Sequence, residues 1–316
     1  MKKFKHIDAK TIDEAASALS SYNGMASVMA GGTDLLGCMK NNILPDYPEA
    51  LVNIKTIPGM DSITEEGGML KIGALATLSD IAHNTTIQSK YSALAEAAYR
   101  VSHPELRNMS TIGGNLCQDV RCWYYRASNN LFYCFRKGGT LCFAVTGDNR
   151  YHAILGGSGC FAVCPSDTAP ALVALDATIV TNKRSIPIGD FFAVMGNVLA
   201  DDEIVTEIQV PTPESGTKQA FIKFAIRKST DFAIVSAATA ITVEAGTVAD
   251  ARIVLGAVAP VPYRATGAED ALKGSTISES TATAAGDAAV TGAVDLGKNK
   301  YKIQIAKTLV KRAILA

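Results

Sequence analysis

The sequence predicts an α+β protein of two domains. Its 316 residues exceed one average domain and fall short of three. Up to about residue 205, short apolar runs alternate with helical patterns, whereas β-branched runs and then two alanine-rich stretches follow. We therefore expect a mixed first domain over 1–205 and a small second domain over 206–316, with an antiparallel sheet backed by helices.

Helix and strand signals follow one another closely in the first domain. Thr11 to Glu14 form a capping box ahead of apolar residues at helical spacing, which predicts a helix over about 12–22. The stretch ASVMAGGTDLLGCMKNN indicates a buried strand, a glycine turn and a helix. Further elements are expected in chain order: strands at 51–54 and 69–74, helices near 78–87 and 91–101, a helix through TAPALVALD that Asp167 can cap, and a strand at ATIVT.

The second domain opens with strand signals. The β-branched runs are EIVTEIQVP, FIKFAIRKS, AIVSAATAITVEA and ARIVLGAVA. Residues 211–218, between the first two runs, indicate a hairpin or linker. Helices over about 280–295 and 300–315 are expected to complete the fold.

Charge and hydropathy exclude some partners. Lysine plus arginine and aspartate plus glutamate each number 30, and no basic block stands out, so neither nucleic acid nor an anionic membrane is an expected partner. No stretch reaches the roughly eighteen apolar residues of a membrane span, and the basic start lacks an apolar leader, so we expect a cytoplasmic protein. Seven cysteines in such a chain favour metal binding over disulfides.

Two glycine pairs have the context of an anion-binding loop. Residues 30–35, AGGTDL, follow a predicted strand and open a helix, and residues 111–115, TIGGN, repeat the glycine pair. Free backbone N–H groups in such a loop can hold one phosphate, so two loops at one cavity would suit the diphosphate of a dinucleotide. Neither loop matches the Rossmann or the P-loop pattern.

Longer motifs resemble a known family. They are AGGTDLL, KIGALATLSDIA at 71–82, LRNMSTIGGNL at 106–116, PSDTAPALVALDATI at 165–179, IGDFF at 188–192, FIKFAIRKSTDFAIVSAA and LGAVAPVPYRA at 255–265. In order and spacing they resemble the FAD-binding subunit of the molybdenum hydroxylases, the xanthine dehydrogenase and carbon monoxide dehydrogenase medium-subunit family. The resemblance implies a two-lobed FAD domain of the vanillyl-alcohol-oxidase (PCMH) type, with lobes of about 1–55 and 56–205, and a small α+β C-terminal domain.

The same resemblance assigns FAD contacts. Gly31, Gly32 and Thr33 would lie at the diphosphate, Asp167 near the ribityl chain or ring, and Lys223 near the isoalloxazine. For Lys223 a plain surface lysine is an equal alternative, and Arg227 and Asp231 could pair with each other. The implied set of cofactor contacts is Ser27, Val28, Met29, Ala30, Gly31, Gly32, Thr33, Asp34, Leu35, Thr111, Gly114, Asn115, Cys164, Asp167 and Lys223.

Five of the seven cysteines lie between residues 122 and 164. Their spacing contains no C-x2-C pair and matches neither common zinc sites nor ferredoxin motifs. Buried thiols, a structural zinc and an iron–sulfur cluster all remain open on spacing alone. The aromatic and leucine residues around them could coat a cluster or be ordinary core: Trp123, Tyr124, Tyr125, Leu131, Phe132, Tyr133 and Phe135.

The position of these cysteines resembles an insertion in one subgroup of the family. Between the second glycine loop and the PSD motif, 4-hydroxybenzoyl-CoA reductase and a periplasmic aldehyde oxidoreductase carry an extra [4Fe–4S] cluster, here over about 118–162. The resemblance implies that the ligands are Cys122, Cys134, Cys142 and Cys160. Cys164 would be a neighbour of flavin or cluster, or could replace Cys160, whereas Cys38 and Cys117 are expected to be small buried residues.

The family resemblance implies an electron-transfer subunit. FAD and the [4Fe–4S] cluster would relay electrons between an external carrier, such as ferredoxin or NAD, and two partners: a molybdopterin-binding large subunit and a small subunit with two [2Fe–2S] clusters. A stand-alone FAD-dependent oxidase or reductase and a zinc-binding assembly subunit are the alternatives. In the relay, His83, His103 and His152 need no catalytic role and are expected at the surface or with satisfied hydrogen bonds.

Overall fold

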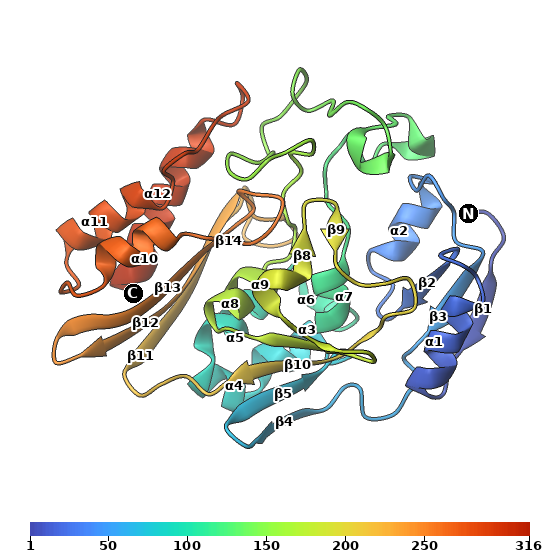
Figure 1. Ribbon diagram of the computed structural model, residues 1–316, viewed down its shortest axis with the longest axis horizontal. Coiled ribbons are helices and arrows are strands. Elements are labelled where there is room, and N and C mark those ends of the chain that lie inside the picture. Colours follow the sequence, from blue (N-terminus) through green and yellow to red (C-terminus); the bar gives the residue numbers. More distant parts are fainter.

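The first lobe is a small parallel sheet. The computed structural model describes residues 1–316, and its first three strands pair in the order β1-β3-β2 (Figure 1). Helix α1 begins after Thr11, whose hydroxyl accepts the Glu14 N–H at 3.1 Å. The Glu14 carboxylate accepts the Lys10 N–H at 2.7 Å in place of the Thr11 N–H, so only half of the expected capping box forms. The elements are β1 (Lys5–Asp8), α1 (Ile12–Ser20), β2 (Ala26–Met29), α2 (Leu35–Lys40) and β3 (Ala50–Asn53).

The second lobe is built on a five-stranded sheet in the order β4-β5-β10-β6-β7. Its strands are β4 (Ile63–Glu66), β5 (Met69–Gly73), β6 (Thr178–Thr181), β7 (Ser185–Pro187) and β10 (Val205–Pro211). We expected the run that forms β10 to begin the second domain, and this was wrong. Strand β10 is antiparallel to both β5 and β6, and Ile208 and Val210 are fully buried in this sheet. The prediction failed because an apolar pattern identifies a strand but not the strands with which it pairs.

Helices cover this sheet. They are α3 (Leu78–His83), α4 (Thr85–Lys90), α5 (Ser92–Tyr99), α6 (Pro104–Arg107), α7 (Ile112–Cys117), α8 (Thr168–Ala174) and α9 (Ile188–Phe191), followed by the hairpin of β8 (Phe192–Ala193) and β9 (Gly196–Asn197). The single helix expected near 78–87 is divided at Asn84. This residue is extended and caps α4 by accepting the Ile87 N–H at 3.1 Å.

Helix α8 is capped by a different residue from the one expected. Asp167 stands at the N-cap position, but its side chain makes no capping hydrogen bond. The hydroxyl of Ser166 instead accepts the Ala169 N–H at 3.1 Å. Asp167 is not available because its carboxylate pairs with Lys223, 2.6 Å away.

The C-terminal region is a four-stranded antiparallel sheet in the order β11-β12-β13-β14. It comprises β11 (Thr217–Phe224), β12 (Val235–Glu244), β13 (Thr247–Gly256), β14 (Tyr263–Arg264), α10 (Thr266–Leu272), α11 (Glu279–Ala288) and α12 (Tyr301–Leu315). Helix α12 packs against β12, which also contacts α5 and α8 (Figure 1). The chain between β10 and β11 is the linker expected near 211–218.

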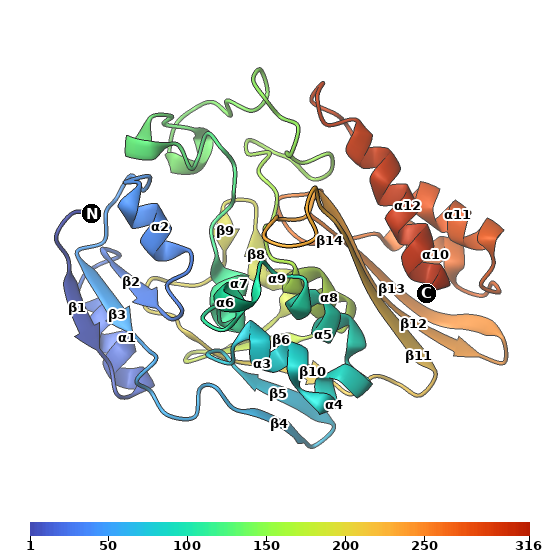
Figure 2. The same cartoon turned by 180° about the vertical axis from the view of Figure 1, so that it is seen from behind.

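The segment between α7 and α8 is mostly irregular. It contains two short 3-10 turns, η1 (Ser128–Asn130) and η2 (Phe135–Lys137), and crosses from α2 toward α12 (Figure 2). At one side Asn129 donates its N–H to Asn41 O at 2.8 Å, and at the other the side chain of Asn149 donates to Leu296 O at 2.7 Å. The segment thus bridges the first lobe and the C-terminal region. No helix in the structure has the length and apolar character needed to cross a bilayer.

Candidate functional site

A cavity of about 390 Å³ lies between the first lobe and the remainder of the molecule. All of Ser27 to Leu35, the end of β2 and the turn that follows it, line this first cavity. Thr111 and Gly114 from the second glycine loop line it as well, so the structure brings the two predicted loops to one space. Cys117, expected to be buried, is accessible and lines the same cavity, whereas Cys38 is buried as expected.

The two glycine loops are in contact. A Cβ on Gly31 would lie 2.0 Å from the carbonyl oxygen of Met109, so only glycine allows this approach. The hydroxyls of Thr33 and Ser110 are 3.0 Å apart. The backbone N–H groups of residues 31–34 donate no hydrogen bond within the chain. A row of unpaired donors at a cavity wall can hold an anion.

Three further cavities continue from the first toward the cysteines. A space of about 80 Å³ shares Thr33 and Gly114 with the first cavity and is lined also by Asn115 and Asp167. It shares Arg121 with a larger cavity of about 360 Å³. The two larger cavities each fall within the roughly 300–1,000 Å³ of typical ligand sites. The three cavities are thus neighbours that share lining residues.

Asp167 and Lys223 form a buried ion pair beside the cavity of about 80 Å³. Their oxygen and nitrogen are 2.6 Å apart, the side chains are 5% and 6% exposed, and Lys223 Nζ also donates to Arg100 O at 3.0 Å. Lys223 is therefore not a surface lysine. Burial raises the pKa of Asp167, and the adjacent ammonium opposes that rise. Arg227 and Asp231 pair with each other, as expected.

Other predicted residues have partners of their own. The hydroxyl of Thr111 accepts the Gly114 N–H at 3.2 Å and so caps α7. The side-chain oxygen of Asn115 accepts hydrogen bonds from Ser166 at 2.6 Å and from Thr168 at 2.7 Å. These contacts fix the second glycine loop against the start of α8.

Asp34 links the first glycine loop to the cysteine-rich segment. One carboxylate oxygen lies 2.5 Å from Arg121 and 2.8 Å from Arg126, and the other accepts the Asp119 N–H at 2.9 Å. Arg126 also donates to the sulfur of Cys38 at 2.8 Å. The side chain of Asp34 is thus committed to protein contacts, although the residue lines the first cavity.

Four of the predicted cysteine ligands meet at one apolar pocket. Cys122, Cys134, Cys142 and Cys160 line a cavity of about 10 Å³ together with Tyr124, Tyr125, Phe135, Phe143 and other residues. This cysteine pocket shares Cys122 with the 360 Å³ cavity. Cys164 does not line it: its side chain is buried in the main core and its N–H donates to Ala259 O at 3.0 Å.

The aromatic coat of the pocket is partial. Tyr124 contacts Phe132 edge-on with ring centroids 5.2 Å apart. Leu131 and Tyr133, expected to belong to the coat, are 72% and 56% exposed. Tyr124 and its aromatic neighbours therefore shield one side of the pocket, and the other side lies close to the surface.

The electrostatics of the pocket disfavour four thiolates without a cation. Burial raises the pKa of Cys122 to about 11 and also raises that of Cys160, and the neighbouring cysteines add to both shifts. No group of three histidine, cysteine, aspartate or glutamate side chains is arranged to bind one metal ion. A zinc site would need its thiolates about 2.3 Å from a single ion. An iron–sulfur cube spaces them more widely, because each thiolate binds a different iron.

Two polar residues beside the pocket were not predicted. His152 is buried, its Nε2 lies 3.2 Å from the sulfur of Cys122, and its Nδ1 has no partner, so the expectation of a satisfied or surface histidine was wrong. Burial lowers the pKa of His152 to about 4. Lys137 is only 4% exposed and its ammonium has no hydrogen-bond partner. The basic pair Arg136-Lys137 was visible in the sequence, but no local signal showed that Lys137 is buried.

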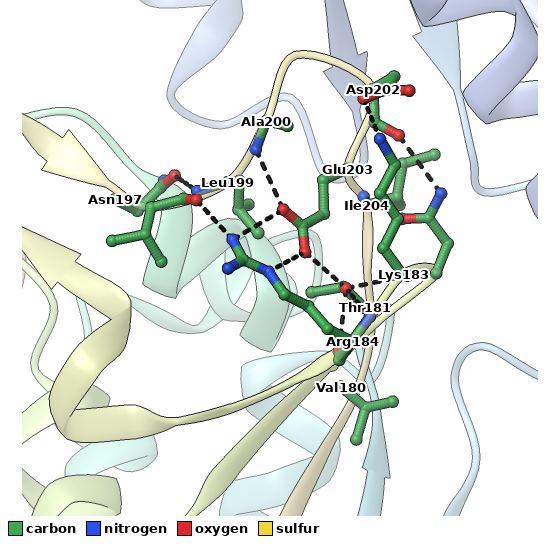
Figure 3. Close-up of polar contacts among 12 residues, drawn as sticks. Val180, Thr181, Lys183, Arg184, Asn197, Leu199, Ala200, Asp202, Glu203 and Ile204 are labelled. Atoms are coloured by element: carbon green, nitrogen blue, oxygen red, sulfur yellow. Dashed lines mark hydrogen bonds and ion pairs between the residues drawn. The ribbon is translucent and has the colours of Figure 1, made fainter.

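A network around Glu203 supports another wall of the first cavity (Figure 3). Its carboxylate accepts hydrogen bonds from Thr181 at 2.8 Å, from Arg184 Nε at 2.9 Å and from the Ala200 N–H at 3.1 Å. These hydrogen bonds lower the pKa of Glu203 to about 2, and the bond from Arg184 has the largest effect. Glu203 thereby fixes the turn that carries Leu199 and Ile204 into the cavity wall.

Comparisons with known proteins agree across the chain. The family model for the FAD-binding domain in molybdopterin dehydrogenase matches residues 2–213, and that for the CO dehydrogenase flavoprotein C-terminal domain matches residues 220–316. The chain is 33% identical to the aldehyde oxidoreductase FAD-binding subunit PaoB of Escherichia coli K12, over 97% of this chain and 96% of that one. It is 30% identical to the carbon monoxide dehydrogenase medium chain of Hydrogenophaga pseudoflava, over 99% and 96%.

Solved structures show the same architecture. The carbon monoxide dehydrogenase of Hydrogenophaga pseudoflava that lacks the Mo-pyranopterin moiety contains a chain that superposes with a TM-score of 0.79 at 28% identity, covering 100% of this chain and 97% of the other. Quinoline 2-oxidoreductase of Pseudomonas putida 86 gives a TM-score of 0.77 at 25% identity, with 100% and 97% covered.

Replacing Glu203 by glutamine should lower the free energy of unfolding by about 2 kcal/mol at neutral pH, because a buried charged acceptor with three donors is lost. Asp202→Asn is the matched control: its pairing with Lys183 is at the surface, and we expect little change. The carboxylate of Glu203 stabilises the fold above its ordinary pKa of 4.5, and this contribution is lost as the pH falls toward about 2. Denaturant unfolding of the three proteins should show the difference between wild type and Glu203→Gln shrinking over that range. A difference independent of pH would contradict the assignment.

Proposed function

The chain belongs to the family of FAD-binding medium subunits of the molybdenum hydroxylases, and on that basis we propose that it is the electron-transfer subunit of a multi-subunit molybdenum-containing oxidoreductase. The family and the α+β fold class inferred from the motifs are thus confirmed. The observation that carries the relay proposal is the series of cavities from the glycine loops to the four cysteines, in which each cavity shares lining residues with the next.

The first glycine loop would hold the FAD diphosphate. Its unpaired N–H groups at residues 31–34 and its contact with the second loop fit two adjacent phosphates. Asp34 would contribute its backbone only, because its carboxylate is engaged by Arg121 and Arg126. Asp167 and Lys223 lie further along the site, where their ion pair can present a fixed donor and acceptor to the polar edge of the flavin.

The protein itself would orient the cofactors, exclude water from them and tune their reduction potentials. When bound, FAD supplies two-electron chemistry that can be converted to single-electron transfer. Leu199 and Ile204 exclude water from the cleft, and Glu203 holds both in place. The carboxylates that line the cavities are each paired with a cation: Asp34, Asp119, Asp167, Glu203 and Asp231. A relay function needs no further proton-transfer residue.

We assign a [4Fe–4S] cluster to Cys122, Cys134, Cys142 and Cys160. The support is the convergence of the four side chains on one apolar pocket and the unpartnered ammonium of Lys137 nearby. Such a cluster supplies one-electron transfer. Because the cysteine pocket and the 360 Å³ cavity share Cys122, the cluster would lie next to the far end of the FAD site.

The partners follow from the family. Relatives are named as a FAD-binding subunit of an aldehyde oxidoreductase and as a medium chain of carbon monoxide dehydrogenase. By analogy, this chain would associate with a molybdopterin-binding large subunit and a small subunit with two [2Fe–2S] clusters, and would exchange electrons with a carrier such as ferredoxin or NAD. A stand-alone flavin oxidase is the less favoured alternative, because relatives that match along more than nine-tenths of their length are named as subunits.

Gly31→Ala should weaken FAD binding about tenfold or more. The added methyl would lie 2.0 Å from the Met109 carbonyl, and relieving that overlap must separate the two loops at a cost of about 1–3 kcal/mol. Gly37→Ala on α2 is the matched control, because no atom lies within 4 Å of its added methyl. Bound FAD is measured by absorbance after gel filtration. Equal flavin content in the two variants would argue against the diphosphate assignment.

Cys160→Ala should lose most of its iron, and Cys164→Ala should keep it. Both thiols are buried, at 6% and 7% exposure, so the pair is matched in packing and differs in access to the cysteine pocket. Iron and zinc are measured by plasma mass spectrometry after anaerobic purification. The reverse pattern would make Cys164 the ligand, and zinc in place of iron would favour the assembly-subunit alternative.

Co-expression tests the complex. The chain should co-purify with a molybdopterin-binding subunit and a small iron–sulfur subunit encoded beside its gene, and substrate should reduce its FAD anaerobically only when all three are present. Reduction of the isolated chain by an organic substrate would instead support the stand-alone oxidase.

A further inference from the structure

Lys137 is a buried cation without a hydrogen-bond partner. Lys137 is 4% exposed, and its ammonium lies 5.1 Å from the ring centroid of Tyr125. A ring face compensates only a small part of the cost of burying a charge. Its backbone N–H donates to Cys134 O at 2.8 Å, and both Cys134 and Tyr125 line the cysteine pocket, so Lys137 lies beside that pocket. The placement of Lys137 therefore makes sense when the cysteine pocket carries negative charge.

His152 is held so that one ring nitrogen meets a cysteine sulfur. Its carbonyl accepts hydrogen bonds from Lys302 Nζ at 3.0 Å and from Asn299 Nδ2 at 3.2 Å, which tie it to the start of α12. Nε2 is 3.2 Å from the Cys122 sulfur, whereas Nδ1 has no partner. A sulfur that binds iron can only accept, so the ring would donate its Nε2–H to that sulfur.

We propose that His152 and Lys137 raise the reduction potential of the iron–sulfur cluster, an inference that rests on the cluster assigned above. Reduction adds one negative charge to the cluster and its thiolates. A hydrogen bond to a ligand sulfur and a nearby cation both stabilise the reduced form more than the oxidised form. His152 acts through Cys122 and Lys137 through its charge, so both are positioning residues.

The test is a redox titration of the iron-loaded chain, monitored by electron paramagnetic resonance. His152→Leu and Lys137→Met should each shift the cluster potential to a more negative value, and the double variant should shift it further. His152→Gln, which keeps an N–H donor, and Lys137→Arg, which keeps the charge, should lie close to wild type. His103→Gln is the remote control, because His103 pairs with Glu105 at the surface.

A second measurement uses the unaltered protein. Hyperfine spectroscopy of the reduced cluster, with ¹⁵N-labelled histidine, should detect one coupled imidazole nitrogen, and it decides the matter if a variant fails to load iron. Full iron content with unchanged potentials, or no nitrogen coupling, would overturn the role of these two residues and leave the relay intact. Wild-type chain that takes up no iron would overturn both.

Discussion

The carboxylate of Asp34 holds the two halves of the site together. It stands in the first glycine loop, yet it binds Arg121, Arg126 and the Asp119 N–H, all in the segment that leads to the cysteines. Removing a carboxylate between two partly buried guanidinium groups would leave them uncompensated. The loop's free N–H groups and the first cysteine ligand are therefore fixed by the same side chain, and the distance between the two proposed cofactors depends on it.

Local structure was predictable where a few neighbouring residues determine it. The hydroxyl cap at Thr11 and the glycine loop at Gly31 act within one or two turns of chain, and the structure has both. Strand β10 was misassigned because its partners, β5 and β6, are distant in sequence. Asp167 failed as a cap for the same reason: its stronger partner, Lys223, lies on β11.

In the site, too, features that depend on residues distant in sequence could not be predicted from local patterns. Spacing alone left the cysteines open between thiols, zinc and a cluster, and only the family resemblance selected four of them. Cys160 and Cys164 are so close in sequence that no pattern could separate them, whereas the backbone places only Cys160 at the pocket. His152 was assigned no role because an electron relay needs no acid–base residue, and its contact with Cys122, thirty residues away, depends on anchoring by Lys302 in the final helix.

The hydrogen bonds that join Asn115 to Ser166 and Thr168 close the base of the cysteine-rich segment, so α7 and α8 contact each other independently of the chain between them. Loop-closure entropy changes slowly with length, so a much shorter connection could join the same two helices. The middle of this connection can thus vary in length without separating α7 from α8, whereas residues 119–126 are tied to the glycine loop through Asp34.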